Sequence, residues 1–187
     1  ATVNRTTNGQ GKVSDLTLEE IKKLSIKSKD GKAYTVPTFK EALAACKKKL
    51  NIYLDFKDAD VAQTWKQIKA AGMEKNVVVY LNEPEQYGAW RNTAPGMPLM
   101  TSLPDSVQTA AQLQQFLSNF HIAVLDNITE QSMLAITRQN KVAVWLDVQS
   151  KTEGPATWDK ALANKVQGLQ SDHPGQLVDY LKQKKQR

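Results

Sequence analysis

The stretch Leu-Asn-Ile-Tyr-Leu-Asp-Phe-Lys at positions 50–57 decides how the rest of the chain is interpreted. Apolar side chains at every second position from Ile52 to Phe56 predict a β-strand with two unlike faces. Asp55 and Lys57 then share the other face at the end of the strand. Charged groups beside an apolar strand are costly unless they are paired or exposed at a mouth. On this stretch alone, a structural salt bridge or an ordinary hydrophilic strand end is the simpler interpretation.

From this strand onward the chain repeats one unit, a strand followed by a helix. Runs such as Val77–Leu81 and Val142–Leu146 are apolar throughout, which is typical of parallel strands covered by helices on the sheet. The predicted strands are 51–56, 77–81, 99–103, 122–125, 142–148 and 166–169. The helices that follow them are predicted at 60–71, 83–92, 106–120, 129–139, 156–163 and 175–184.

Two further helices are predicted before the first strand. Thr17 and Glu20 form the pattern of a capping box, so a helix is expected to run from there to about Leu24. Pro37 and Thr38 are expected to open a second helix over 39–49.

Polar residues follow most of the predicted strands, at the edge of the sheet where α/β folds bind their ligands. They are Asp55, Lys57, Asn82, Ser102, Asp126, Asn127, Asp147, Ser171 and Asp172. No glycine-rich dinucleotide motif or Walker loop follows any strand, which disfavours nucleotide-binding folds. Six units predict a (β/α)8 TIM barrel of which this chain supplies about the last six βα units. A complete barrel has about 250 residues, so two units would be missing.

Composition and charge limit the kinds of partner and site that this chain can have. The 187 residues carry a net charge of +6, but the runs Lys47–Lys49 and Lys182–Arg187 contain no interleaved aromatic residues. Solvated helix ends explain them better than a nucleic-acid track, so we expect no nucleic-acid partner. No apolar run reaches membrane-spanning length, and we expect no membrane insertion. A single cysteine, Cys46, excludes an intrachain disulfide and a cysteine-based zinc site.

Five stretches, in order, resemble the glycerophosphodiester phosphodiesterase family. Asn-Arg-Thr-Thr-Asn-Gly at 4–9, with Gly11, Val13, Asp15 to Thr17 and Glu20, is similar to the loop after that family's second strand. The other four are the helix start at 36–43, Leu-Asp-Phe-Lys at 54–57, Val-Trp at 144–145 and Gly-Leu-Gln-Ser-Asp-His-Pro at 168–174. The resemblance spans essentially the whole chain, so residues 1–187 are expected to form the C-terminal three quarters of a single TIM-barrel phosphodiesterase domain.

The chain departs from the family pattern in two ways. The family's carboxylate on the central strand is usually Glu, whereas this chain has the shorter Asp55. The family's His-Arg-Gly, Glu-x-Asp and His-Asp motifs all precede the loop at 4–9. No catalytic residue is therefore expected in this chain, and the general acid and base are expected upstream of Ala1, in a missing N-terminal segment of the same barrel.

The resemblance implies roles for three residues. Asp55 would bind a divalent cation, Mg²⁺ or Ca²⁺, and Lys57 would bind the substrate phosphate. Trp145 would form an apolar wall for the glycerol side, with core packing an equally good alternative. We expect Asp55 and Lys57 to project into one cavity with Trp145 nearby.

Other residues are expected to be structural. His121 precedes a strand on the edge opposite the site, and His173 stands where the family commonly has Arg or Tyr. Arg5 is expected to be solvated, and the tryptophans Trp65, Trp90 and Trp158 are expected to pack on helices.

The implied activity of the complete protein is metal-dependent hydrolysis of a small-molecule glycerophosphodiester to glycerol 3-phosphate and an alcohol. We expect the 187 residues alone to be inactive and poorly stable as a monomer, because two strand edges would be unpaired. The alternative is a non-catalytic phosphate- or polyol-binding barrel or an inactive fragment. The resemblance is compatible with a periplasmic or secreted location and does not exclude the cytoplasm.

Overall fold

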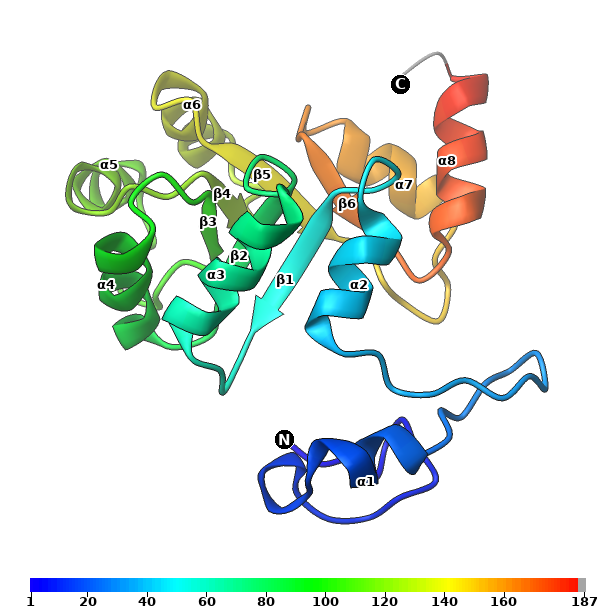
Figure 1. The fold of residues 1–187 in the computed structure, drawn as a ribbon. Coiled ribbons are helices and arrows are strands. Elements are labelled where there is room, and N and C mark those ends of the chain that lie inside the picture. Colours follow the sequence, from blue (N-terminus) through cyan, green and yellow to red (C-terminus); the bar gives the residue numbers. More distant parts are fainter. Residues whose placement is uncertain (185–187) are drawn as a thin grey trace.

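A computed structural model describes residues 1–184, and in them six parallel strands form one curled sheet (Figure 1). The strands follow one another across the sheet in chain order, β1 to β6, and every neighbouring pair is parallel. Their bounds are β1 (Ile52–Phe56), β2 (Val77–Leu81), β3 (Leu99–Thr101), β4 (Val124–Asp126), β5 (Ala143–Asp147) and β6 (Gly168–Gln170). The predicted six-unit part of a TIM barrel is confirmed.

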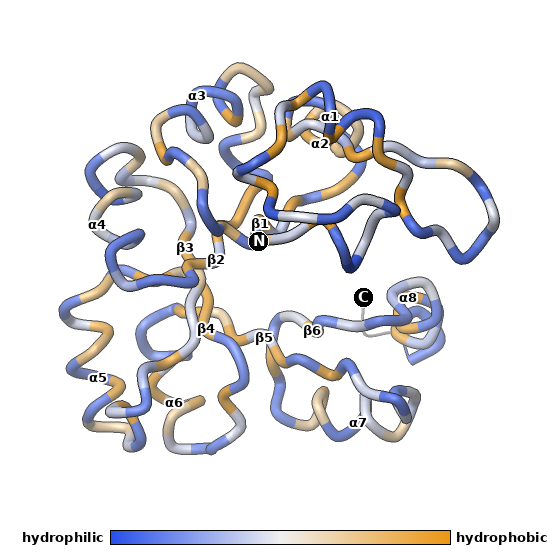
Figure 2. Tube along the Cα trace, turned by 90° about the horizontal axis from the view of Figure 1, so that it is seen from below, coloured by the Kyte–Doolittle hydropathy of each residue, from blue (hydrophilic) through white to orange (hydrophobic). Residues whose placement is uncertain are grey.

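A helix follows each strand and lies outside the sheet, as Figure 2 shows from the end where the strands finish. These helices are α3 (Val61–Ala71), α4 (Pro84–Thr93), α5 (Ala110–Asn119), α6 (Gln131–Gln139), α7 (Pro155–Leu162) and α8 (Pro174–Gln183). Before β1 come a 3-10 turn, η1 (Val13–Asp15), and the helices α1 (Leu18–Lys23) and α2 (Phe39–Cys46).

Local sequence explains where these elements begin. The Thr17 side chain accepts a hydrogen bond from the Glu20 backbone, and Thr38 and Glu41 make the same capping box at α2. Thr109 caps α5, so this helix starts at Ala110, four residues later than predicted. The last strand is shifted to 168–170, because it pairs with β5 through Trp145 and Gly168 rather than along the apolar run at 166–169.

The core lies between the sheet and its helices. Ile68, Val79, Leu99 and Leu125 have no exposed surface. Trp90 is also fully buried and meets Phe56 edge to ring, with 5.2 Å between the ring centroids. Trp158 is likewise buried and Trp65 is partly buried against the core, in agreement with the predicted packing roles. Along β2, fully buried and partly buried residues alternate. One face of this strand therefore packs against helices and the other faces the barrel interior.

The first 36 residues form a separate segment beyond the end of β1 at which the strand finishes (Figure 1). Isolated bridges such as Thr7 with Ile26 and Ser25 with Thr35 hold its loops together. A salt bridge of 2.8 Å from Lys22 Nζ to Glu41 Oε2 joins α1 to α2.

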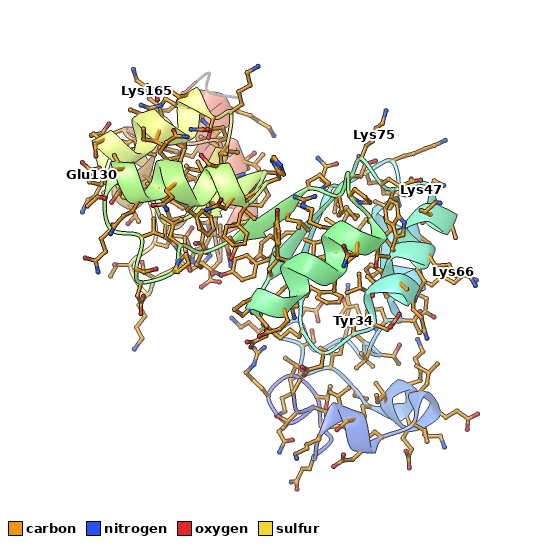
Figure 3. All side chains as sticks on the ribbon, turned by 90° about the vertical axis from the view of Figure 1, so that its left-hand side faces the viewer. Tyr34, Lys47, Lys66, Lys75, Glu130 and Lys165 are labelled. Carbon is orange, nitrogen blue, oxygen red and sulfur yellow. The ribbon has the colours of Figure 1, made fainter. Side chains whose placement is uncertain are left out.

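The lysines of the helix layer point into solvent. Figure 3 shows Lys47, Lys66 and Lys75 projecting outward, and Lys47 to Lys49 are all exposed. Lys182 and Lys184 are also exposed, whereas residues 185–187 of the second basic run lie outside the described part of the chain. These positions agree with the prediction of solvated helix ends. None of the described helices has the length and apolar character required to cross a membrane.

The sheet is open. Among the described residues β1 pairs only with β2, and β6 only with β5, so each has a free outer edge. The free edge leaves β1 only half buried, and its Tyr53 is 38% exposed.

The contact between Lys22 and Glu41 generates a pH prediction. Hydrogen bonds from Lys22 first, then from Thr38, lower the pKa of Glu41 from 4.5 to about 2. Because the folded-state pKa is depressed, the contact stabilises the docked segment above about pH 4.5 and is lost as the pH falls towards 2. We expect the carboxyl carbon of Glu41 to titrate near 2 by NMR. Lys22→Gln should raise this pKa, whereas the neighbouring Lys23→Gln should leave it in place. A Glu41 pKa near 4.5 in the unchanged protein would contradict the contact.

Candidate active site at the mouth of the barrel

The carboxyl ends of the strands surround a cavity of about 240 Å³. Its walls come from all six strands and from residues just after some of them, because parallel strands present their ends at one edge. The lining residues are Tyr53, Asp55, Tyr80, Asn82, Met100, Asp126, Asn127, Trp145, Leu146, Asp147 and Gln170. Asp55 and Trp145, two of the three predicted site residues, therefore line the same cavity.

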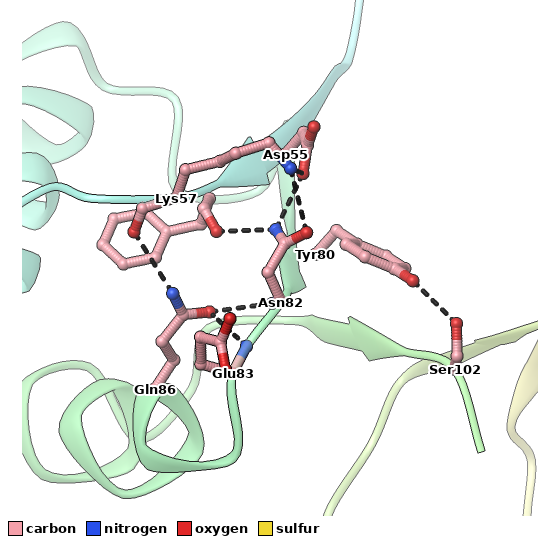
Figure 4. Close-up of polar contacts among 8 residues, drawn as sticks. Asp55, Lys57, Tyr80, Asn82, Glu83, Gln86 and Ser102 are labelled. Atoms are coloured by element: carbon pink, nitrogen blue, oxygen red, sulfur yellow. Dashed lines mark hydrogen bonds and ion pairs between the residues drawn. The ribbon is translucent and has the colours of Figure 1, made fainter. Parts of the chain in front are cut away.

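Lys57, the third, sits at the rim of this cavity and is not among its lining residues. Its Nζ donates to Asp55 Oδ1 and to Asn82 Oδ1, at 2.9 Å each (Figure 4). The Asn82 amide in turn donates to Asp55 Oδ1 at 2.8 Å and to the carbonyl of Phe56 at 2.7 Å. Asp55, Lys57 and Asn82 thus form a closed polar triad at the ends of β1 and β2, and the expected link between Asp55 and Lys57 is present.

Gln86 on α4 holds the triad from outside. Its amide nitrogen donates to the carbonyl of Lys57 at 3.2 Å, and its oxygen accepts from the Asn82 backbone at 2.8 Å. The position of Asn82 therefore depends on the first turn of α4 as well as on β2. Asn82 was predicted to lie at this edge, but no role in the site was predicted for it.

The Asp55–Lys57 ion pair is partly solvated. The Lys57 side chain is 54% exposed and that of Asp55 is 47% exposed. Ion pairs with this exposure contribute about 1 kcal/mol or less to stability. Lys57 can therefore exchange Asp55 for another anion at little cost.

Asp55 is held in its ionised form. Partial burial by itself raises the pKa of its carboxyl group, but the hydrogen bonds from Asn82 and Lys57 and the charge of Lys57 outweigh this and lower it. Both hydrogen bonds reach Oδ1, and Oδ2 accepts no hydrogen bond from residues 1–184. Oδ2 is consequently the oxygen that can face a cation.

Aromatic side chains form one wall of the cavity. Tyr53 lies between Tyr80 and Trp145, with ring centroids 5.7 and 6.1 Å apart. Burial first, and the charge of Asp55 second, raise the pKa of Tyr53, so its hydroxyl stays protonated. Neither tyrosine was predicted as a site residue. Tyr53 is two residues before Asp55 on the same strand face, and Tyr80 is the partner of Asp55 across the β1–β2 register, so the strand alignment contained the signal.

A second polar chain links the carboxyl ends of β2, β3 and β4. The hydroxyls of Tyr80 and Ser102 are 2.7 Å apart, and Ser102 Oγ donates to Asp126 Oδ2 at 3.0 Å. Burial is the main cause of a raised pKa for Tyr80. Ser102 and Asp126 were expected at this edge without a role in the site.

Neither histidine lines the cavity. The backbone N–H of His121 donates to the Tyr87 hydroxyl at 2.9 Å and its carbonyl accepts from Arg91, at the opposite edge of the sheet as predicted. His173 precedes α8, is exposed, and donates its backbone N–H to Ser171 Oγ at 2.9 Å. The described residues therefore place no imidazole at the mouth.

Asp55 by itself is not a metal site. In residues 1–184 no group of three or more histidine, cysteine or acidic residues lies close enough together to hold an ion. Asp126 and Asp147 line the same cavity but do not form such a group with Asp55. The described residues therefore offer a divalent cation one potential ligand, Asp55 Oδ2, and not a complete coordination sphere.

Comparison with known proteins gives one family. The model of the glycerophosphoryl diester phosphodiesterase family matches residues 1–176. No curated protein sequence matches the chain.

Solved structures share the fold. A glycerophosphodiester phosphodiesterase from Agrobacterium tumefaciens str. C58 is 18% identical with a TM-score of 0.78, over 91% of this chain and 74% of that one. A glycerophosphoryl diester phosphodiesterase from Parabacteroides distasonis is 21% identical with a TM-score of 0.75, over 97% and 68%. An Oleispira antarctica phosphodiesterase, solved with the product sn-glycerol-3-phosphate, is 15% identical with a TM-score of 0.74, over 97% and 76%.

The position of Trp145 generates a prediction, because Gly168 on the neighbouring strand lies against its ring. A Cβ at position 168 would lie 2.5 to 2.7 Å from Trp145 ring atoms, closer than any real contact. Gly168→Ala should push the indole out of its place in the cavity wall and destabilise the fold by about 1–3 kcal/mol. The indole N–H resonance of Trp145 should shift in NMR spectra. The control is Gly88→Ala, because a Cβ at position 88 meets nothing within 4 Å. If the Trp145 resonance does not shift in Gly168→Ala, the placement of the Trp145 ring against Gly168 is wrong.

Proposed function

Because the chain belongs to the glycerophosphoryl diester phosphodiesterase family, we propose that it forms most of the barrel of an enzyme that hydrolyses glycerophosphodiesters to glycerol 3-phosphate and an alcohol. The family match over residues 1–176 is the observation that carries this proposal. The polar triad of Asp55, Lys57 and Asn82 at the carboxyl edge of the sheet supports it, because this is the edge at which barrel enzymes work.

Lys57 is proposed to bind the phosphate. Its ammonium group is already directed to the mouth by Asn82 and Asp55, and its half-exposed ion pair can open for a phosphate oxygen. A charge that is in place before the reaction stabilises the negative charge that develops on the phosphoryl oxygens. Lys57 therefore acts as an electrostatic stabiliser, while Asn82 keeps it oriented.

A divalent cation is proposed to complete the site, with Asp55 as one ligand. The described mouth carries the carboxylates Asp55, Asp126 and Asp147 and a single lysine at its rim. This excess of negative charge repels a phosphodiester unless positive charge is added. Mg²⁺ or Ca²⁺ prefers carboxylate oxygens, and such an ion polarises phosphoryl oxygens when it is bound. The remaining ligands are proposed to come from a further segment of the same barrel.

Trp145 is proposed to form the apolar wall against the glycerol part of the substrate. Its ring lines the cavity, one strand face is shared with Asp147, and Gly168 leaves the space that the indole needs. The neighbouring Tyr53 extends this wall towards Asp55.

Proton transfer is proposed to depend on residues outside this chain. His121 is at the wrong edge of the sheet and His173 does not line the cavity. We propose that a further segment of the same barrel, lying against β1 and β6, supplies the general acid and base and the remaining metal ligands. The 187 residues alone should then bind substrate weakly and not turn it over.

A non-catalytic phosphate- or polyol-binding barrel is the second candidate. The observation that favours it is the absence of an imidazole from the mouth within residues 1–184, since a phosphate can be bound without proton transfer. Turnover of glycerophosphocholine by the complete polypeptide, with added Mg²⁺ or Ca²⁺, would exclude this candidate.

Replacing the two charges of the triad tests their roles. In the complete polypeptide, Lys57→Ala should lower the turnover of glycerophosphocholine about a hundredfold, which corresponds to about 3 kcal/mol. The metal concentration that gives half-maximal activity should be the same in Lys57→Ala as in the unchanged protein. Asp55→Ala should lower turnover and also raise the metal concentration needed for half-maximal activity. A hydrolysis assay over a series of Mg²⁺ and Ca²⁺ concentrations measures both the turnover and the metal dependence.

The matched controls are Lys75→Ala and Asp179→Ala, exposed residues of the same types away from the mouth. They should leave both readouts unchanged. An unaltered metal dependence in Asp55→Ala would show that another carboxylate holds the ion.

A further inference from the structure

A second, mostly apolar groove of about 560 Å³ opens between α4 and α5. Its volume falls in the range of small-molecule sites, about 300–1,000 Å³, and exceeds that of the mouth cavity. We call it the α4–α5 groove. Its apolar lining includes Pro84, Tyr87, Val107, Phe116, Phe120 and Ile122.

Aromatic side chains of both helices line this groove instead of closing it. Phe120 stacks on Phe116 at 4.9 Å between ring centroids and meets Tyr87 of α4 edge to ring at 5.1 Å. Phe120 is nevertheless 38% exposed. Tyr87 and Phe116 are partly buried. Burying an aromatic side chain is strongly favourable, so an exposed ring at the end of this aromatic set, beside a site, indicates a binding surface.

The groove adjoins the mouth of the barrel. Tyr80 and Asn82 line both the groove and the mouth cavity, and Asn82 holds the Nζ of Lys57 at 2.9 Å. Ser102, which is hydrogen-bonded to Tyr80, lines the groove as well. A phosphate held by Lys57 therefore lies next to the point where the groove begins.

The lining also limits what can occupy the groove. Its single charged side chain is Glu83, beside Asn82 at the end near the mouth. The inner part near Phe116, Phe120 and Ile122 offers ring and aliphatic surface. A sugar or polyol there would lose hydrogen bonds to water without gaining partners. An alkyl chain has no such cost. The groove also lies beside β2 and β3, away from the free edges of β1 and β6.

We propose that the α4–α5 groove binds an alkyl chain on the alcohol part of the substrate, so that the preferred diesters are glycerophosphate esters of long-chain alcohols. This inference rests on the proposed function, because it places the phosphate at Lys57 and extends the alcohol side past Asn82 and Tyr80. The glycerol side then faces the wall formed by Trp145 and Tyr53.

The test compares three soluble diesters, the methyl, butyl and octyl esters of glycerol 3-phosphate, below micellar concentrations. Each is titrated by isothermal calorimetry into the complete polypeptide, with EDTA present so that no diester is hydrolysed. Each fully buried methylene should tighten binding about fourfold. With about half of the chain surface buried in an open groove, we expect the octyl ester to bind about a hundredfold more tightly than the methyl ester.

Groove variants locate the effect. Phe120→Ser removes one exposed ring, and Ser106→Phe adds bulk at another lining position. Both should reduce the octyl-over-methyl advantage at least tenfold while methyl ester binding stays the same. Tyr34→Ser, an exposed aromatic of the N-terminal segment, should keep the full advantage.

Three results would overturn the inference. They are an octyl ester that gains nothing over the methyl ester, a gain that survives in both groove variants, or self-association of the chain that Phe120→Ser abolishes, which would assign the groove to a second copy. The proposed function has a separate readout. If Lys57→Ala leaves methyl ester binding unchanged while the octyl gain still depends on Phe120, the phosphate site is wrong and the apolar groove is right.

Discussion

The parallel register between β1 and β2 is the constraint on which the site depends. It pairs Asp55 with Tyr80 and Phe56 with Leu81, so the next residue along, Asn82, reaches the end of β1. The Asn82 amide then satisfies the carbonyl of Phe56 and one oxygen of Asp55 together. A shift of one residue would turn Asp55 and Tyr53 into the apolar helix layer, where an unpaired carboxylate is very costly. The β1–β2 register therefore places Asp55 at the mouth, and the cost of burying its charge disfavours any other register.

Different strands supply different parts of the mouth. β1 supplies the charged pair, β2 supplies the amide that orients it, and β5 supplies the indole of Trp145. The side chains that carry charge are half exposed, whereas the residues that fix the strands behind them, such as Val79 and Leu125, are fully buried. A rigid interior thus holds a few polar groups whose own bonds are weak enough to be exchanged for a ligand.

The fold could be predicted from the sequence because strand and helix periods alternate six times with short connections. Ends of elements were less predictable. Thr109 delays α5, and pairing with Trp145 moves the last strand to Gly168. In the site, Asp55, Lys57 and Trp145 were marked by their place at strand ends and by family resemblance, but their chemical roles are still predictions. Tyr53, Tyr80 and Asn82 required the register between strands, which is a relation between segments about 25 residues apart. The groove between α4 and α5 depends on how two helices pack, and no local pattern encodes that.

The order of the strands has a consequence for how the chain folds. Because spatial order equals chain order, each paired strand lies only about 20–25 residues from its neighbour. Every new strand thus closes a loop of similar, modest length, and the entropic cost of each closure is nearly the same. Such a sheet can grow one βα unit at a time from any starting unit, with little dependence on which unit forms first. Closing the ring between the free edges of β1 and β6 is a different event. Those edges are separated by more than a hundred residues of sequence, and the gap left for a closing segment depends on the curvature that the earlier units have already built.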